Sequence, residues 1–358
     1  MSDSFIKKTE LSIKKGINKF LFSGGQPELV SEPIKLFDEN IKRILLLRQD
    51  RIGDVLVSTG FLRNLRKIMR NSEIDILLSN KNFGARRAAD PWADNVLKYK
   101  KGLNQSIKLI GQLKKRKYDL VIDLFDNAST TSSILLKNLN AKYKLGFEKE
   151  NSGNYSHIVP LPNKREVHIV DRIANLLLPF GLEPSEMDLR LEYKLSENDK
   201  IKAMEKIPKS DREILGINLA GSSRAKYWGT SNNIEFIKKI EGQDIDIIIF
   251  SMPDYKAELD EICSKTKANP APAASSVHEY ACLLSRCDFL LTTDTSAVHF
   301  ASAFDIPQIA LYTEGRDPAA PLPWMAYKSE ARSLVSPSRQ LSDINPDDVH
   351  KAFLEIYK

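Results

Sequence analysis

Short runs of apolar residues alternate along the chain with longer segments in which apolar residues recur at helical spacing. The first series of runs comprises RILLL (43–47), IDILL (74–78) and DLVIDL (119–124). The second comprises ILGIN (214–218), IDIIIF (245–250), DFLLT (288–292) and PQIAL (307–311). Continuous apolar runs are typical of parallel strands that helices cover on both faces. The pattern therefore predicts an α/β protein with two doubly wound, Rossmann-like halves and a ligand at the carboxyl ends of the strands.

The length of the chain also favours two domains. A single core seldom fills 358 residues, and Pro179 and Pro184 interrupt the pattern between the two series. We predict a joint there. The predicted parts are an N-terminal extension over 1–40, a first domain over 41–185, a linker over 186–195 and a second domain over 196–358.

The first forty residues differ in character from the rest. In SFIKKTELSIKKGINKFLF (4–22) apolar residues can gather on one helical face with lysines around it. Such a basic amphipathic helix can lie on an anionic membrane. A helix packed on its own domain explains the pattern equally well. The stretch SGGQPELVSEP (23–33) that follows is typical of a linker.

Composition narrows the class of protein. The formal net charge of +6, from 53 Lys and Arg against 47 Asp and Glu, suits an anionic ligand or membrane surface but is too small and too dispersed to indicate nucleic acid. Three cysteines without paired spacing predict neither a disulfide framework nor a zinc site. No apolar run approaches the roughly 18 residues of a membrane span, and lysines interrupt the first twenty residues, so no cleavable signal is expected. We expect a cytoplasmic protein, with possible peripheral contact at the inner face of the cytoplasmic membrane.

Asp54 is the first candidate for chemistry. It follows the first apolar run at the point where a helix is expected to begin, and Gly53 before it permits a tight turn. Free N–H groups at a helix start favour an ionised carboxylate, which could act as a general base toward a bound hydroxyl. An ordinary helix-capping aspartate explains the same position. Asp50 is a weaker candidate.

A second candidate is the loop NLAGSSRAKYWG (218–229), which follows the run ILGIN. Small residues with hydroxyls at Ser222 and Ser223 and cations at Arg224 and Lys226 are the ingredients of a phosphate-binding turn. A polar surface loop is the alternative interpretation.

The third candidate is the end of the strand in LLTTDTSAVHF (290–300). A helix that begins directly after Asp294 would present free N–H groups beside the hydroxyls of Thr295 and Ser296, and this arrangement suits an anion. Asp294 could hydrogen-bond a sugar hydroxyl. His299, one turn further, could donate to a phosphate or pack structurally.

Together, three stretches resemble glycosyltransferase family 9, the bacterial heptosyltransferases that build the inner core of lipopolysaccharide. They are RQDRIGDVLVSTGFLRNLR (48–66), GSSRAKYW (221–228) and TTDTSAVHFASAFDIPQIALY (292–312). The resemblance implies the GT-B fold, in which two Rossmann-like domains face each other across a cleft. It also implies inverting transfer of a sugar, typically heptose from an ADP-activated donor, to a lipid-linked oligosaccharide acceptor, with no metal or other cofactor.

The resemblance also assigns roles to single residues. Asp54 resembles the catalytic base of the family, and Lys226 resembles the lysine that meets the diphosphate of the donor. Asp294 resembles the acid that holds the donor sugar, while Thr295, Ser296 and His299 fall in the segment that binds phosphate. The chain departs from the family where Gly229 replaces a frequent proline and where Ser296 replaces a frequent glycine.

The acceptor is expected to bind the first domain beside Asp54. If it carries phosphates, cations near Asp54 have a use, although a solvated helix face explains them as well. These cations are Arg51, Arg63, Arg66 and Lys67, followed by Arg86 and Arg87. Two other functions fit a chain of this type: a nucleotide-sugar epimerase of similar fold, or a non-catalytic transferase-like protein that binds membrane or saccharide. A dinucleotide oxidoreductase is disfavoured because no G-x-G-x-x-G follows a predicted strand.

Overall fold

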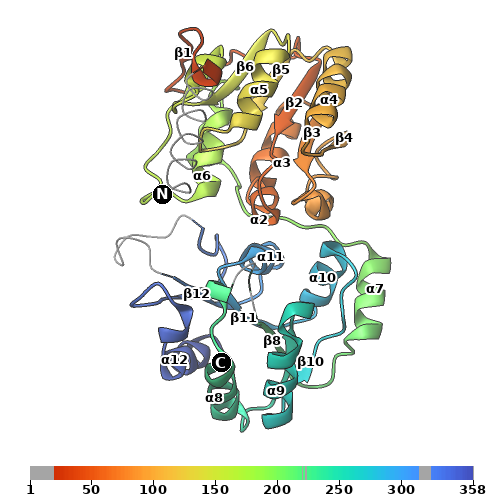
Figure 1. Cartoon of the computed structure of the whole chain (residues 1–358), viewed down its shortest axis with the longest axis vertical. Helices are drawn as coiled ribbons and strands as arrows, with labels where there is room; N and C mark the ends of the chain where they lie inside the picture. The colour runs from red at the N-terminus through yellow and green to blue at the C-terminus, as the bar shows by residue number, and fades with distance from the viewer. Residues whose placement is uncertain (1–19, 220, 222–223, 314–323, 358) are drawn as a thin grey trace, which may run out of the picture. The chain divides into compact units, whose positions relative to one another are not determined.

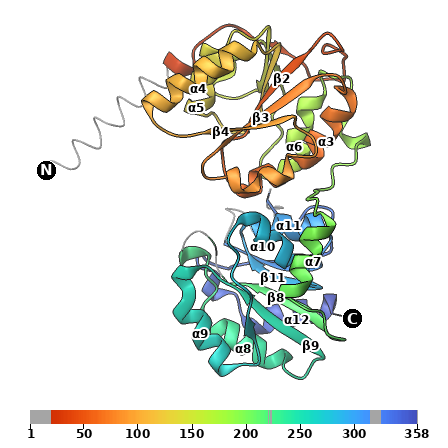
Figure 2. The same ribbon diagram turned by 90° about the vertical axis from the view of Figure 1, so that its right-hand side faces the viewer.

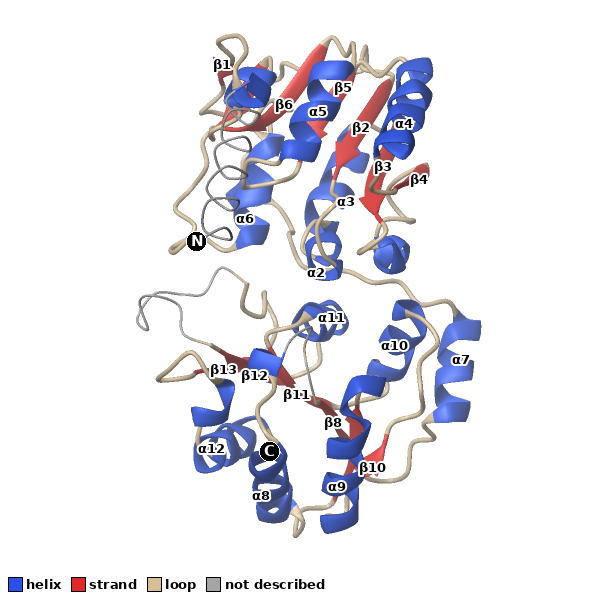
Figure 3. Cartoon of the chain, in the orientation of Figure 1, coloured by secondary structure: helices blue, strands red, loops and turns tan. Residues whose placement is uncertain are grey.

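A computed structural model of the chain describes residues 20–219, 221, 224–313 and 324–357. The chain divides into two compact units, which we call unit 1 and unit 2 (Figure 1). Unit 1 comprises the residues up to Asn163 together with Ile169–Leu189. Unit 2 comprises Lys164–His168 and the residues from Arg190 onward. Each unit is built around its own parallel sheet (Figure 3).

Unit 1 contains a seven-stranded sheet in the order β1-β7-β6-β5-β2-β3-β4, in which all neighbours are parallel. The strands are β1 (Glu28–Leu29), β2 (Arg43–Leu47), β3 (Glu73–Ser79), β4 (Asn95–Tyr99), β5 (Leu120–Asp123), β6 (Tyr143–Phe147) and β7 (His157–Val159). The helices are α2 (Ile52–Leu56), α3 (Thr59–Ile68), α4 (Leu103–Arg116), α5 (Thr130–Asn138) and α6 (Ile169–Ala174).

Helices cover both faces of the unit 1 sheet, as the continuous apolar runs predict. Alternate residues of a strand point to opposite faces. Leu45 and Leu47 of β2 share a buried cluster with residues of α4 and α5, whereas Ile44 and Leu46, also buried, point to the other face. The helices α3 and α6 lie on that face (Figure 2). A strand enclosed in this way needs apolar side chains at every position, which is why RILLL carries no alternation.

Unit 2 has a six-stranded parallel sheet in the order β10-β9-β8-β11-β12-β13. Its strands are β8 (Glu213–Asn218), β9 (Ile245–Phe250), β10 (Asn269–Pro270), β11 (Phe289–Thr293), β12 (Gln308–Tyr312) and β13 (Ala331–Val335). Its helices are α7 (Glu197–Lys206), α8 (Thr230–Ile240), α9 (Lys256–Lys265), α10 (Val277–Leu284), α11 (Ser296–Phe304) and α12 (Pro346–Ile356). The helices α8, α9 and α12 pack on one face of the sheet, and α10 and α11 lie on the other (Figure 2).

All seven apolar runs of the sequence form strands, which confirms the prediction of two parallel α/β halves. The linker predicted over 23–33 is wrong in part, because β1 lies within it and pairs with β7. Phe37, further along, is fully buried against the rings of Tyr143 and Phe180, so this segment packs on unit 1. The amphipathic pattern of residues 1–19 lies outside the described residues. Among the helices that the structure describes, none is long and apolar enough to cross a membrane.

The strand order reverses once in each sheet. In unit 1 the chain runs outward from β2 through β3 to β4, and then continues from β5 on the other side of β2. In unit 2 the same reversal lies between β8 and β11. Ligands of open α/β sheets bind at such switch points, at the carboxyl ends of the strands. The three candidate stretches of the sequence follow β2, β8 and β11, which are strands at these two switch points.

Candidate active site

Asp54 lies at the switch point of unit 1, in the third position of α2. Its Oδ2 accepts a hydrogen bond of 2.6 Å from the backbone N–H of Arg51, and its Oδ1 lies 3.6 Å from Nη2 of Arg48. The residue is 6% exposed. The helix begins at Ile52, two residues before Asp54, so this carboxylate caps its own first turn. The N-cap is Arg51, so the helix start expected at Asp54 is wrong; Asp54 instead accepts from the backbone of the N-cap, as in a capping box, and its role as a base remains a prediction.

Arg48 is the charged centre of this loop, and nothing in the local sequence distinguishes it from an ordinary polar residue after a strand. Its side chain is 1% exposed and donates to the backbone carbonyls of Asp54 and Leu124, at 2.9 Å each. Its Nη1 lies 3.4 Å from Oδ2 of Asp50. Burial raises the pKa of Asp50 to about 8; Arg48 opposes this shift, and nearby carboxylates add to it. Asp50 therefore differs from an ordinary surface aspartate.

Further charged residues lie after β5, the neighbour of β2. Asp123 at the end of β5 is fully buried; its Oδ2 lies 3.1 Å from Nζ of Lys149 and accepts a hydrogen bond of 2.6 Å from the hydroxyl of Tyr155. Asp126, three residues on, pairs with the buried Arg172 of α6 at 3.0 Å. The switch point of unit 1 thus encloses several carboxylates and cations at once.

The six predicted acceptor cations are not brought together. Arg86 and Arg87 are exposed in the short helical segment Phe83–Ala88. Arg51 is exposed and lies at the start of α2, close to Asp54. Arg63 is largely buried and donates to the backbone carbonyl of Asp188 at 2.8 Å. Arg66 and Lys67 lie at the far end of α3, near the amino edge of the sheet, because the helix runs away from the site. Arg66 donates to the carbonyl of Ser72, and Lys67 lines a separate hollow of about 250 Å³.

In unit 2, Lys226 and Asp294 meet across the switch point. Lys226 follows β8 in a short helical turn (Arg224–Lys226), and Asp294 follows β11. The ammonium donates to the Oδ2 of Asp294 at 2.5 Å and to its backbone carbonyl at 2.7 Å. Arg224 instead pairs with Glu258 of α9 and lies over the ring of Tyr255. Lys226 is therefore the cation of this loop that reaches the carboxyl end of β11.

The backbone around Lys226 is held on both sides. Trp228 is buried and its indole N–H donates to the carbonyl of Ile344 at 2.9 Å. Gly229 follows with φ 111° and ψ 144°, a conformation nearly restricted to glycine. Proline, with φ fixed near −65°, cannot adopt this conformation. Before the turn, a Cβ on Gly221 would meet Lys226 at 2.9 Å, so glycine permits this close approach. Ser222 and Ser223 lie outside the described residues.

The start of α11 is where the sequence places an anion site. Thr295 is the N-cap, and its hydroxyl accepts from the N–H of Ala297 at 3.1 Å and from the side-chain amide of Asn218 at 3.2 Å. This hydroxyl already has protein partners. Ser296 occupies the first helical position and is half-buried, as is Asp294. The helix start thus lies directly beside the Lys226–Asp294 pair.

His299 lies within α11 and is buried. Burial lowers its pKa to about 3, with smaller contributions from the charges of His168 and Lys226. The imidazole is therefore neutral at physiological pH. Its Nδ1 has no hydrogen-bond partner among the described residues, and its ring lies 6.1 Å from that of Trp324. Any contact with phosphate would be that of a neutral N–H donor.

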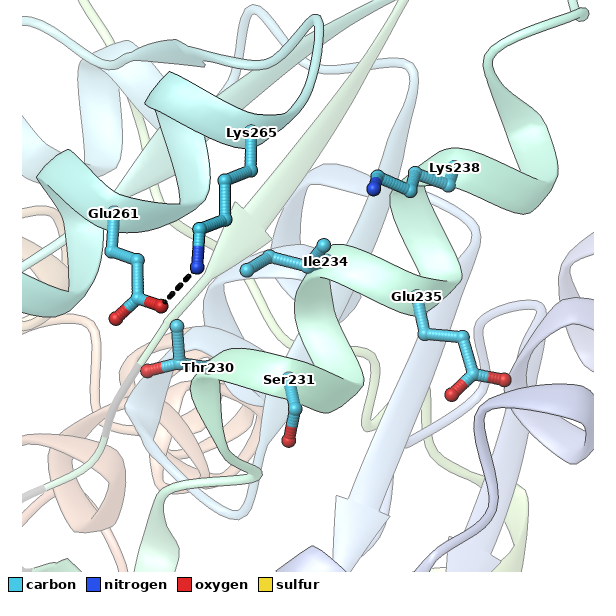
Figure 4. A pocket seen from close by; sticks show the side chains of 7 residues that line it. All are labelled: Thr230, Ser231, Ile234, Glu235, Lys238, Glu261 and Lys265. Atoms are coloured by element: carbon cyan, nitrogen blue, oxygen red, sulfur yellow. Dashed lines mark hydrogen bonds and ion pairs between the residues drawn. The ribbon is translucent and has the colours of Figure 1, made fainter.

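Two other features of unit 2 share no residue with the predicted site. A hollow of about 560 Å³ lies between α8 and α9, and the side chains around it include Lys238 and the ion pair of Glu261 with Lys265 (Figure 4). At the contact of α7 with α10, the ligand atoms of three potential metal ligands lie within 4.8 Å of one another: Asp199, His278 and Cys282. Hydrogen bonds account for this second cluster, because the two nitrogens of His278 lie 3.2 Å from Asp199 Oδ1 and 2.9 Å from the hydroxyl of Tyr193.

Two doubly wound parallel sheets of this kind make up the GT-B fold, which solved heptosyltransferases also have. A family model matches residues 106–347, and the chain belongs to glycosyltransferase family 9 (heptosyltransferase). It is a glycosyltransferase, as the sequence indicates.

Individual relatives agree with the family assignment. The chain is 23% identical to lipopolysaccharide core heptosyltransferase OpsX of Haemophilus influenzae over 286 residues, which cover 77% of this chain and 80% of the relative. A glycosyl transferase family 9 structure from Veillonella parvula has a TM-score of 0.76 at 20% identity, covering 91% of this chain and 99% of that one. Escherichia coli heptosyltransferase WaaC, solved with ADP-2-deoxy-2-fluoro heptose, has a TM-score of 0.70 at 17% identity, covering 88% of this chain and 100% of that one.

Proposed function

We propose that this chain is an inverting glycosyltransferase that moves heptose from ADP-heptose to a lipopolysaccharide core or related surface-glycan acceptor. Membership of family 9 supports transfer, and the heptose analogue in the solved WaaC structure supports the donor. The observation that carries the proposal is the pairing of Lys226 with Asp294 beside the start of α11. A cation next to a helix N-terminus suits a diphosphate, and a carboxylate next to both suits a sugar hydroxyl.

On the donor side, Lys226 would exchange partners. In the free chain its ammonium is held by Asp294, and the diphosphate would take over one of those hydrogen bonds. Asp294 could then accept a hydrogen bond from a hydroxyl of the donor sugar. The N–H group of Ser296 and the neutral His299 would add uncharged donors, while Thr295 keeps its capping role. The predicted contacts of Ser222 and Ser223 remain part of the proposal.

On the acceptor side, Asp54 would act as the general base. Its carboxylate would take the proton of the acceptor hydroxyl as that oxygen bonds to the anomeric carbon and the bond to the diphosphate breaks. Attack from the opposite side inverts the anomeric carbon. A base of this kind typically contributes about 10²- to 10⁴-fold to the rate. Of the predicted acceptor cations, we assign contact with the acceptor to Arg51, because its backbone N–H bonds to Asp54 and its side chain is exposed.

The proposal requires no metal in the transfer step. Negative charge grows on the departing nucleoside diphosphate, and Lys226 with the helix N-terminus supplies the positive potential that stabilises it. Addition of a chelator should then leave the rate unchanged. Loss of activity with EDTA, restored by Mg²⁺, would overturn this part of the proposal.

The test is a transfer assay with ADP-heptose and a heptose-deficient lipopolysaccharide core acceptor. We expect mass spectrometry to show one added heptose, and NMR to show that the anomeric configuration of the product is opposite to that of the donor. Conversion of the donor alone into an epimer would favour the epimerase. Donor binding with no turnover on any acceptor would favour the non-catalytic binding protein.

A further inference from the structure

The loop after β2 places two carboxylates on one buried cation. Nη1 of Arg48 lies 3.4 Å from Oδ2 of Asp50, and Nη2 lies 3.6 Å from Oδ1 of Asp54. Both carboxylates are mostly shielded from water. Within the described part of the chain, Arg48 is the cation that pairs with either of them. Two ionised carboxylates would leave this group with a net negative charge in an environment that penalises it.

The neighbouring charged residues do not neutralise this net negative charge. Asp123 and Asp126 lie on the β5 side of the loop and raise the pKa of Asp50 further. The cations on that side are held by these acids: Lys149 by Asp123 at 3.1 Å and Arg172 by Asp126 at 3.0 Å. The 3₁₀ segment η1 (Phe83–Ala88), which packs on α2, contributes two exposed cations, Arg86 and Arg87.

Unsatisfied atoms occur in the same place. Oδ1 of Asp50 and Nη2 of Arg48 are buried and have no hydrogen-bond partner among the described residues. An ionised carboxylate would normally fill both oxygens with donors when buried. A neutral carboxyl with one bare oxygen carries a smaller penalty, so this environment favours the protonated form of Asp50.

We propose that Asp50 retains a proton at neutral pH and acts as a positioning residue. A neutral Asp50 does not compete for the positive charge of Arg48, so the guanidinium stays paired with Asp54. The positioning role rests on the proposed function, in which Asp54 is the base. When the environment favours the protonated form of one of two neighbouring carboxyl groups, the two groups can take different roles. Asp54 keeps Nη2 of Arg48 at 3.6 Å from its Oδ1, and its carboxylate can accept the proton of the acceptor hydroxyl. Ionisation of Asp50 at alkaline pH would make it compete for Arg48 and draw the guanidinium away from Asp54.

The proton on Asp50 is testable without any activity measurement. An unfolded aspartate ionises near pH 4, whereas folded Asp50 ionises near its raised pKa of about 8. Between these values Asp50 binds more protons in the folded chain than in the unfolded chain, so its contribution to wild-type stability falls as the pH rises and levels off above about 8. Asp50→Asn does not titrate. Its melting temperature should therefore gain on that of the wild type from pH 5 to pH 8 and then hold a constant difference.

The control for this titration is Asp254→Asn, at an exposed aspartate of unit 2. Its melting temperature should follow that of the wild type at every pH. A difference in melting temperature between Asp50→Asn and wild type that stays constant from pH 5 to pH 9 would overturn the proton assignment, because Asp50 would then be ionised throughout.

The positioning role is tested by the pH profile of transfer. At pH 7, the transfer rate of Asp50→Ala should be about tenfold or more below wild type, because Nη1 of Arg48 loses a fixed acceptor. The transfer rate of Asp50→Asn should be within about threefold of wild type. Wild-type activity should decline above about pH 8, and Asp50→Asn should not follow it. An Asp50→Asn variant as inactive at pH 7 as Asp50→Ala would overturn the role. Full transfer by Asp54→Asn would instead overturn the proposed base, and the melting experiment would still report on the proton of Asp50.

Discussion

Replacement of Lys226 by alanine should weaken donor binding strongly and leave the fold nearly unchanged. A hydrogen bond to a charged group contributes about 1.5–3 kcal/mol, and each 1.4 kcal/mol is a factor of ten. Loss of the contact between ammonium and diphosphate should therefore raise the Kd for ADP about 10- to 150-fold. The side chains of Lys226 and Asp294 are 23% and 36% exposed, and ion pairs in such positions contribute roughly 0–1 kcal/mol to stability. The melting temperature should accordingly change little.

Isothermal titration calorimetry with ADP and with ADP-heptose separates the two partners of this pair. Lys226→Ala should raise the Kd of both ligands by a similar factor, because both carry the diphosphate. Asp294→Asn should weaken ADP-heptose relative to ADP, because the sugar is present in one ligand alone. It should not weaken ADP itself, since Lys226 is then released from its carboxylate partner.

The matched control is Lys238→Ala, which removes the same charge from an exposed position on α8 (Figure 4). It should bind ADP with wild-type affinity. If Lys226→Ala binds ADP within twofold of wild type, or if Lys238→Ala weakens ADP as much, Lys226 does not contact the diphosphate. The interpretation of the loop after β8 as a phosphate site would then be wrong.

Three further predictions follow from the geometry of the chain. The contribution of buried His299 to wild-type stability should be lost as the pH drops below about 6.5, by up to about 1.4 kcal/mol per pH unit, because the folded imidazole stays neutral while the unfolded imidazole gains a proton. The melting temperature of His299→Asn should therefore gain on that of wild type as the pH falls, and a constant difference between the two would exclude this. Gly229→Ala should destabilise by about 1–3 kcal/mol in denaturant unfolding, whereas Gly242→Ala, which has open space around it, should be close to neutral; equal effects would contradict the strain argument. Removal of residues 1–19 should reduce co-sedimentation with anionic vesicles, and unchanged co-sedimentation would refute the membrane prediction for that segment.

The apolar pattern of the sequence was enough to predict the central strands and the location of the candidate residues after them. Strands enclosed on both faces, such as RILLL, leave an unmistakable run of branched side chains. Outer strands do not: β1 has two residues within a stretch rich in Gly and Pro, and β13 reads ARSLV. Pairing in these strands depends on a neighbouring edge that the local sequence does not reveal.

The site was predictable in outline but not in its electrostatics. Arg48 and Asp50 look like ordinary polar residues after a strand, because the groups that meet them, the carbonyl of Leu124 and the carboxylate of Asp123, come from the end of β5 more than seventy residues later. For Arg66 the sequence suggested a location near the site that the structure does not show. A helix rises about 1.5 Å per residue, so α3 carries its last turn far from the switch point where it begins.

The proposed mechanism depends on Asp54 as the group that removes the proton of the acceptor. The most direct measurement is the single-turnover transfer rate of Asp54→Asn, with the Kd for ADP-heptose determined on the same preparation. We expect a rate reduced about 10²- to 10⁴-fold and a donor Kd within twofold of wild type, because the proton would lose its acceptor while the donor site stays intact. A variant that still transfers heptose at half the wild-type rate or faster would contradict the mechanism.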